Sequence, residues 1–94
     1  NISERSYSMS KMCEPIAVLV QSLHHLGFTT IEQKVSDYHF SELYIKMKGK
    51  QNNKIDTINI PDIQRNNDST FTCSCHWSTV ELCYEEEETR ANAK

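Results

Sequence analysis

The chain has 94 residues and a formal net charge of −3, and 37% of its residues are hydrophobic while 24% are charged. This length corresponds to one small domain, and the composition is too apolar for a chain that is disordered throughout. The longest apolar run, Ile16 to Val20, is much shorter than the roughly 20 residues that a transmembrane helix needs. The composition therefore excludes a membrane-spanning helix.

The charge differs between the two parts of the chain. Residues 1–54 hold seven basic and five acidic residues, whereas residues 55–94 hold three basic and eight acidic residues. A dedicated nucleic-acid-binding domain usually carries a basic excess over its whole length. Binding of nucleic acid would therefore depend on one local patch.

The start of the chain indicates the cellular compartment and the extent of the domain. Asn1 is not followed by the pattern of a signal peptide, so we expect an intracellular protein with reduced cysteines, in the cytoplasm or the nucleus. Because the first residue is not Met, we expect a piece of a larger protein. Residues 1–11 are rich in serine and lack a hydrophobic period, which predicts a flexible leader before a single domain over residues 12–85.

A helix is predicted to begin at about residues 13–15. Pro15 suits the first turn of a helix, where its missing N–H would have had no partner. Gly27 is the expected residue after the helix, with a positive φ, and Phe28 can fold back on the last turn as in a Schellman motif. Apolar residues follow at the spacing of one helix face: Ile16, Leu19, Val20, Leu23 and Leu26.

The hydrophobic period then changes to that of strands. Weak alternation predicts a short strand at residues 31–35, and clear alternation of Leu43, Ile45 and Met47 predicts a half-buried strand. We expect a hairpin loop over residues 49–53 and a return strand over residues 55–60 that ends at Pro61. Residues 61–70 are polar and predict a loop.

The last apolar stretch changes parity along its length. Phe71, Cys73, Cys75 and Trp77 share one parity, whereas Val80, Leu82 and Tyr84 share the other. One regular strand cannot bury both sets on the same face. Either a bulge lies near residues 77–79, or the chain turns at residues 78–79 so that Trp77 faces Val80. Glu85 is the first of four consecutive glutamates. The residues after it, 86–94, predict an acidic tail or the start of a further helix.

Together these elements predict an α+β fold, with an N-terminal helix packed on a three- or four-stranded antiparallel β-meander. In outline this order resembles RWD-type interaction modules and double-stranded-RNA-binding domains. The proline-rich turn of the former and the basic helix N-terminus of the latter have no counterpart here, and an outline alone does not carry function. The predicted core contains Ile16, Leu19, Val20, Leu23, Leu26, Phe28, Leu43, Ile45, Met47, Ile58, Ile60, Phe71, Cys73, Cys75, Trp77, Val80, Leu82 and Tyr84.

Cysteine and histidine suggest metal binding or catalysis only weakly. Cys73, Cys75, His76 and Cys83 are zinc-ligand types, but on a strand His76 points away from the two cysteines before it. A catalytic Cys–His pair needs its sulfur and imidazole within hydrogen-bond reach, which neighbours on a strand do not provide. We therefore expect no enzyme, no cofactor and no metal ligands, with a zinc-stabilised domain as the least favoured alternative.

The best candidate site for a partner is the side of the helix away from its core stripe. No charged residue lies between Glu14 and Glu32, so this helix carries a second, weaker apolar face. We expect a non-catalytic protein–protein interaction module, acting as a scaffold or adaptor, with dimerisation as one form of it and no membrane contact. The partner would cover the second helix face or pair with an open sheet edge. The predicted partner-binding residues are Ala17, Val18, Gln21, His24 and His25.

The alternative function is nucleic-acid binding through a lysine hairpin. Lysines can neutralise phosphates, and an aromatic ring can stack on a base. A solvated face with edge lysines that discourage aggregation explains the same pattern. The residues of this alternative are Tyr44, Lys46, Lys48, Lys50 and Lys54.

Overall fold

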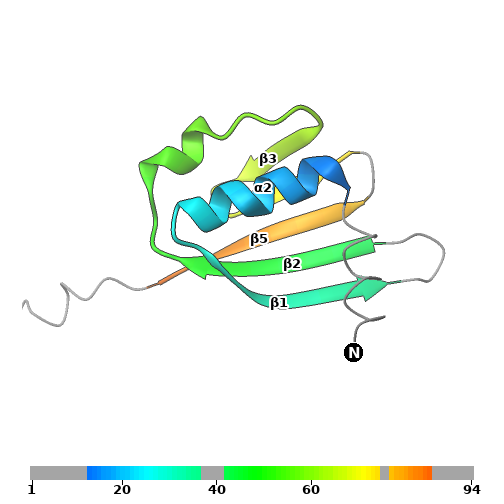
Figure 1. Cartoon of the computed structure of the whole chain (residues 1–94), viewed down its shortest axis with the longest axis horizontal. Coiled ribbons are helices and arrows are strands. Elements are labelled where there is room, and N and C mark those ends of the chain that lie inside the picture. The colour runs from blue at the N-terminus through cyan, green and yellow to red at the C-terminus, as the bar shows by residue number, and fades with distance from the viewer. Residues whose placement is uncertain (1–12, 37–41, 75–76, 86–94) are drawn as a thin grey trace, which may run out of the picture.

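The computed structural model describes residues 13–36, 42–74 and 77–85, which form one α-helix, one 3₁₀ helix and a five-stranded sheet (Figure 1). The predicted leader and the predicted acidic tail lie outside these residues. No helix among the described residues has the length and apolar character to cross a membrane. The elements are α2 (Glu14–His25), β1 (Thr29–Ser36), β2 (Glu42–Gly49), η1 (Asn53–Thr57), β3 (Ile63–Asn67), β4 (Thr70–Cys73) and β5 (Ser78–Tyr84).

The sheet has the strand order β1-β2-β5-β4-β3. Strand β5 lies between β2 and β4 and is parallel to β2, while the other neighbouring strands are antiparallel. The α+β class with an N-terminal helix is confirmed, but the antiparallel meander is wrong. A parallel neighbour needs a long crossover connection, which here contains η1, β3 and β4. The sheet therefore departs from the outlines of both RWD-type and double-stranded-RNA-binding domains.

The predicted helix and its ending are confirmed. Ile16, Leu19 and Leu23 are buried, as the helical spacing predicts. Gly27 has φ +101°, its N–H donates to the His24 carbonyl at 3.0 Å, and the Phe28 N–H donates to the Leu23 carbonyl at 3.0 Å. These two bonds form the Schellman motif, which turns the chain from the helix directly into β1.

The two strands predicted after the helix are present and pair with each other. In β2, Leu43, Ile45 and Met47 are buried against the core, and the residues between them point to the face away from α2. The register places Val35 beside Leu43, and it shifts between Thr30 and Glu32 at a bulge. Strand β1 extends beyond the predicted residues 31–35 at both ends.

The predicted return strand over residues 55–60 is wrong. The Asn52 side chain accepts a hydrogen bond from the Lys54 N–H at 2.8 Å and caps the 3₁₀ helix η1. This short helix buries Ile55, which the predicted core omitted. The chain then runs extended through Ile58 and Ile60 without entering the sheet. Local capping by an asparagine thus overrides the apolar spacing that suggested a strand.

The predicted loop over residues 61–70 is also wrong, because it contains β3 and the turn into β4. Cys73 pairs with Ser78 and Phe71 pairs with Val80, so the chain reverses within residues 74–77 rather than at 78–79. Trp77 ends this reversal with φ +54°. Because of this reversal, the even-numbered residues of β5 lie on the same face as the odd-numbered residues of β4. Phe71 and Val80 are therefore both buried on that face.

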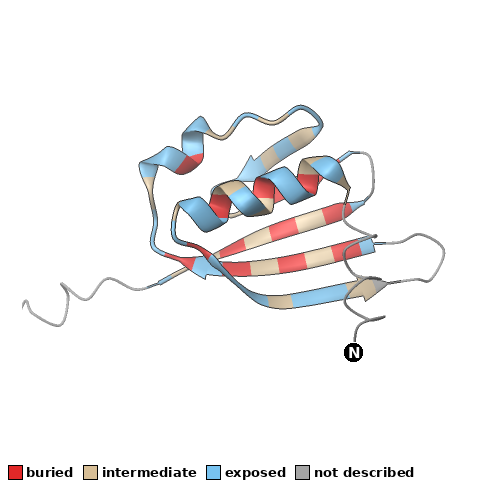
Figure 2. Ribbon diagram, viewed as in Figure 1, coloured by how far each residue is buried: buried red, intermediate tan, exposed pale blue. Residues whose placement is uncertain are grey.

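The core lies between α2 and one face of the sheet, and Figure 2 shows buried residues in alternation along β2 and β5. Most of the predicted core is confirmed as buried or half-buried. Trp77 is the exception, since 66% of it is exposed, while Cys75 lies outside the described residues. The buried apolar residues are Ile16, Leu19, Leu23, Phe28, Leu43, Ile45, Met47, Ile55, Phe71, Cys73, Val80 and Leu82.

Candidate functional site

A continuous hollow runs along the exposed side of α2, and we call it the helix groove. It consists of two adjoining cavities of about 570 and 450 Å³. Val18, Asn59 and Ile60 line both cavities, which makes the groove continuous. Its lining residues are Cys13, Glu14, Pro15, Val18, Ser22, His25 and Leu26 from the helix side, and Lys54, Thr57, Ile58, Asn59, Ile60, Pro61 and Asp62 from the opposite wall.

The helical period creates the first wall of the groove. The stripe of Ile16, Leu19 and Leu23 faces the sheet, so Val18 projects to the side. Val18 is 42% exposed, which makes it one of the large apolar residues that the described structure leaves open to solvent. An exposed valine beside a hollow offers apolar surface that a ligand can cover.

The second wall is the crossover segment after η1. Ile58 and Ile60 are half-buried and pack against the core, which holds this extended segment close to the helix. The segment ends in a turn, where the Ile63 N–H donates to the Ile60 carbonyl at 3.1 Å and Asp62 has φ +73°. Pro61 suits the preceding position of such a turn because its ring fixes φ near the required value. The packing of Ile58 and Ile60 against the core and the turn after Ile60 therefore fix the position of this wall.

The two ends of the helix groove differ in charge. Glu14 and Asp62 line the end near the start of α2, and both are exposed. Lys54 and His25 line the opposite end, and both are also exposed. The groove thus has an apolar middle, an acidic end and an end that carries a lysine and a histidine.

The structure divides the five predicted partner-binding residues between the helix groove and the neighbouring surface of α2. Val18 and His25 line the helix groove. Ala17, Gln21 and His24 are also exposed but do not line the groove, and His24 Nε2 lies 3.4 Å from Thr30 Oγ1 at the start of β1. All five are solvent-exposed, and Gln21 stands one helical turn from Ala17, Val18 and His25.

The five residues of the nucleic-acid alternative are also divided. Tyr44, Lys46 and Lys48 lie on the sheet face away from α2, where they alternate with the buried positions of β2. Lys50 follows β2, whereas Lys54 lies on η1 and lines the helix groove. The predicted lysine hairpin therefore does not exist as one patch.

Carboxylates accompany the aromatic and basic residues of this open sheet face. The Tyr44 hydroxyl donates a hydrogen bond to Glu81, and this bond raises the pKa of Tyr44 to about 12. The Nζ atoms of Lys34 and Lys46 lie 3.1 and 3.8 Å from the carboxylate of Glu32. These acids offset the positive charge that a phosphate backbone would need.

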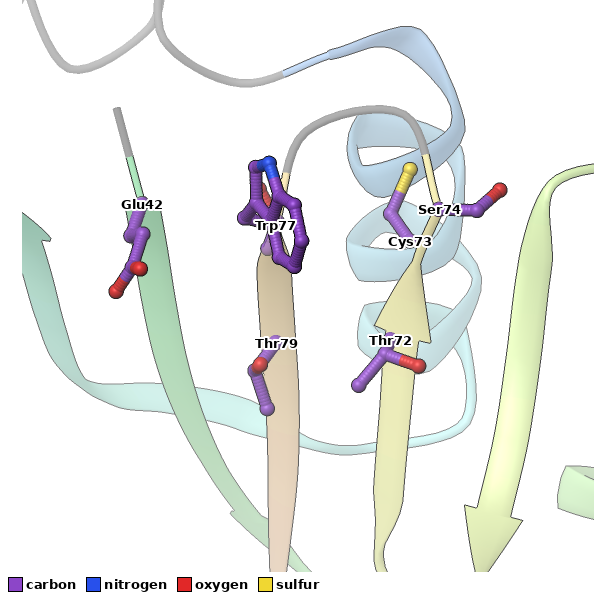
Figure 3. Close-up of a pocket in the computed structure, with 7 residues that line it drawn as sticks. Glu42, Thr72, Cys73, Ser74, Trp77 and Thr79 are labelled. Carbon is purple, nitrogen blue, oxygen red and sulfur yellow. The ribbon is translucent and has the colours of Figure 1, made fainter. Parts of the chain in front are cut away.

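A second hollow of about 570 Å³ lies at the end of the sheet where β4 turns into β5. Figure 3 shows the Trp77 indole between Glu42 of β2 and Cys73 of β4, with Thr72 and Thr79 beyond it. The sequence interpretation missed this exposed ring because strand parity assigned Trp77 to the core. No pattern in the sequence predicts the positive φ of Trp77, which ends the reversal.

The cysteines fall into separate environments. Cys13, directly before α2, and Cys73, at the end of β4, approach with their Sγ atoms 3.4 Å apart. Cys83 is half-buried on β5, and Cys75 and His76 lie outside the described residues. Among the residues that the structure describes, no three histidine, cysteine or acidic side chains gather in a geometry that could hold a metal ion.

Comparisons of the chain with protein-family models, with curated proteins and with solved structures returned no match.

Proposed function

We propose that this chain is a non-catalytic protein-interaction module of a larger intracellular protein, and that the helix groove binds a peptide segment of the partner. The observation that carries the proposal is the exposed Val18 in a continuous groove whose opposite wall contains Ile58 and Ile60. Binding sites for peptides commonly combine an apolar middle with polar groups at the rim. The groove has both features.

Burial of apolar surface would supply part of the binding free energy. Val18 is 42% exposed, so covering it contributes about 1 kcal/mol. Ile58 and Ile60 are half-buried in the wall and offer further apolar surface. Ser22 and Asn59 lie within the same stretch, and they can donate or accept hydrogen bonds that fix the orientation of a peptide backbone.

The charges at the two ends indicate the chemistry of the partner. Lys54 and His25 favour an acidic residue, whereas Glu14 and Asp62 favour a basic residue. The expected ligand is a peptide with apolar side chains in the middle, a basic residue at one end and an acidic residue at the other. The polarity of the groove also sets the direction in which this peptide lies along α2.

Selection from a random peptide library displayed on phage tests this function. We expect peptides of the stated pattern to be enriched on the chain and to lose binding to the Val18→Asp variant. Ala17→Asp is the matched control, since Ala17 is exposed on the same helix but does not line the groove. The Lys54→Glu variant should select against an acidic residue at that end of the peptide.

The same selection can overturn the proposal. Circular dichroism first establishes that each variant keeps the folded structure. Peptides that bind wild type, Val18→Asp and Ala17→Asp equally would place the site elsewhere. A selection that yields no peptide with the predicted pattern would also contradict the proposal.

A further inference from the structure

Strand β1 forms one edge of the sheet, and within the described residues it has β2 as its single neighbouring strand. Much of it is exposed, including Gln33 and Lys34, and Ile31 is 51% exposed. Figure 1 shows β1 at the side of the sheet, away from the strands that α2 overlies. A bulge interrupts β1 at its start, but from Glu32 to Ser36 its register with β2 is regular. This regular part can accept another strand.

The sequence of β1, TTIEQKVS, is complementary to itself when read in the opposite direction around Gln33. In an antiparallel pair centred on this residue, Glu32 lies opposite Lys34 of the second strand, and Lys34 lies opposite its Glu32. Val35 comes opposite Ile31, which lies at the bulge at the start of β1. Opposite charges and apolar residues at directly facing positions stabilise an antiparallel pair.

We propose that β1 pairs with β1 of a second copy of this chain, with the two Gln33 residues facing each other on a two-fold axis. The resulting dimer contains one continuous ten-stranded sheet, since each copy contributes the five strands described above. The axis is perpendicular to the sheet, so both α2 helices lie on the same face. This surface is distinct from the helix groove, and the inference does not depend on the proposed function.

The two faces of β1 agree with this pairing. Glu32 and Lys34 stand beside Lys46 and Tyr44 in the register with β2, so they lie on the face away from α2. Facing residues of paired strands point to the same side, so Glu32 and Lys34 of the second copy meet on that face. There Glu32 would continue the contacts that it already makes with Lys34 and Lys46.

Val35 lies on the other face, where it stands beside Leu43 and is half-buried on the side of α2. Ile31 is the residue at the register shift between Thr30 and Glu32, and it is exposed. A second strand at this edge reaches Val35 and the exposed Ile31 at the bulge, which covers apolar surface that a single copy leaves open to solvent. Both faces of the strand therefore gain contacts in one register.

Two-fold axes on the residues next to Gln33 do not bring opposite charges together. An axis on Glu32 places the two Glu32 carboxylates opposite each other, and an axis on Lys34 does the same for two lysines. Like charges in directly facing positions destabilise a strand pair. The register centred on Gln33 is therefore the one selected by charge within the regular part of β1.

Sedimentation equilibrium with a charge-reversal pair tests the proposal. Glu32→Lys places lysines at positions 32 and 34, and Lys34→Glu places glutamates at both positions. We expect each variant alone to dimerise at least about tenfold more weakly than wild type, because both charge pairs become repulsive. An equimolar mixture of the two variants should recover dimerisation as a heterodimer, since attractive pairs form again.

Two controls separate this inference from loss of folding and from the groove. Circular dichroism checks that each variant is folded, and Val18→Asp should leave the dimerisation constant unchanged. A wild-type chain that remains monomeric at submillimolar concentration would overturn the proposal. It would also be overturned if either variant alone dimerised as tightly as wild type, or if their mixture failed to recover dimerisation.

Discussion

The ring of Phe28 occupies the space in which any side chain at Gly49 would have to lie. A Cβ at position 49 would be 2.7 Å from Cδ2 of Phe28 and 3.1 Å from its Cα. Phe28 is 1% exposed at the end of the Schellman motif, and Gly49 is buried at the end of β2. The Tyr84 ring packs edge-on against Phe28 with the centroids 6.1 Å apart. This contact joins the end of the helix to the ends of β2 and β5.

The variant Gly49→Ala should therefore lower the free energy of unfolding by about 1–3 kcal/mol, because the added methyl overpacks this junction. Denaturation in urea measures the change. The variant Phe28→Leu removes part of the ring, so its effect and that of Gly49→Ala should not add in the double variant. Full additivity of the two changes would show that the Phe28–Gly49 contact is not the cause.

Arg65 should be replaceable by lysine only at a cost. Its guanidinium binds Asp56 of η1, donates to the carbonyls of Asn67 and Asp68 at 3.2 Å each, and lies 5.7 Å from the centroid of the Phe71 ring. Lysine keeps the charge but lacks the planar fork that makes these contacts together. We expect Arg65→Lys to lower the free energy of unfolding by about 1 kcal/mol.

Asp56→Asn provides the second arm of this test. This substitution removes the negative charge that Arg65 binds, while the side chain at position 56 keeps nearly the same size. If the contact between η1 and β3 stabilises the crossover, Asp56→Asn combined with Arg65→Lys should cost less than the sum of the single changes. A double variant whose loss equals that sum would contradict the contact.

The Tyr44–Glu81 hydrogen bond should make stability depend on pH in the alkaline range. The bond raises the pKa of Tyr44 to about 12 from the ordinary value of 10.0. Because the folded-state pKa lies above the unfolded one, the stabilisation is fully present below pH 10.0 and is lost as the pH rises toward 12. Ultraviolet titration of wild type against Tyr44→Phe measures the pKa directly.

Glu81→Gln is the control for this titration, because it removes the charge that accepts the bond. It should return the pKa of Tyr44 toward the ordinary value. If Tyr44 of the wild-type chain titrated with its ordinary pKa, this result would contradict the Tyr44–Glu81 hydrogen bond.

The fluorescence of Trp77 should be that of a solvent-exposed indole and not that of a buried one. It is the one tryptophan of the chain and is 66% exposed. We expect its fluorescence in the folded protein to be readily quenched by acrylamide and to shift little toward longer wavelengths on unfolding. A strongly blue-shifted emission that acrylamide quenches poorly would instead agree with the core position that strand parity predicts.

The elements that sequence reasoning predicted correctly depend on local signals. Pro15, the apolar stripe from Ile16 to Leu26 and Gly27 define the helix within one segment, and the alternation around Ile45 defines β2 in the same way. The insertion of β5 between β2 and β4 has no such signal. It depends on contacts between residues far apart in the chain, such as Met47 beside Leu82.

The candidate site was predictable on one wall only. Val18 lies off the core stripe, so the helical period alone indicates its exposure. The opposite wall was assigned to a strand, because Ile58 and Ile60 have the spacing of alternate strand residues. The Asn52 cap that starts η1 and the turn at Pro61 set the course of this segment, and their effect on the helix groove depends on packing that the sequence does not reveal.

Amide chemical-shift mapping by heteronuclear NMR tests the central claim of a peptide-binding groove most directly. The protein is titrated with a peptide selected on the wild-type chain, and the shifted amides are located on the structure. We expect the largest shifts along both walls of the helix groove, at Val18, Ser22, His25, Ile58 and Ile60. Shifts that gather instead on the open sheet face around Tyr44, or beside Trp77, would contradict this claim.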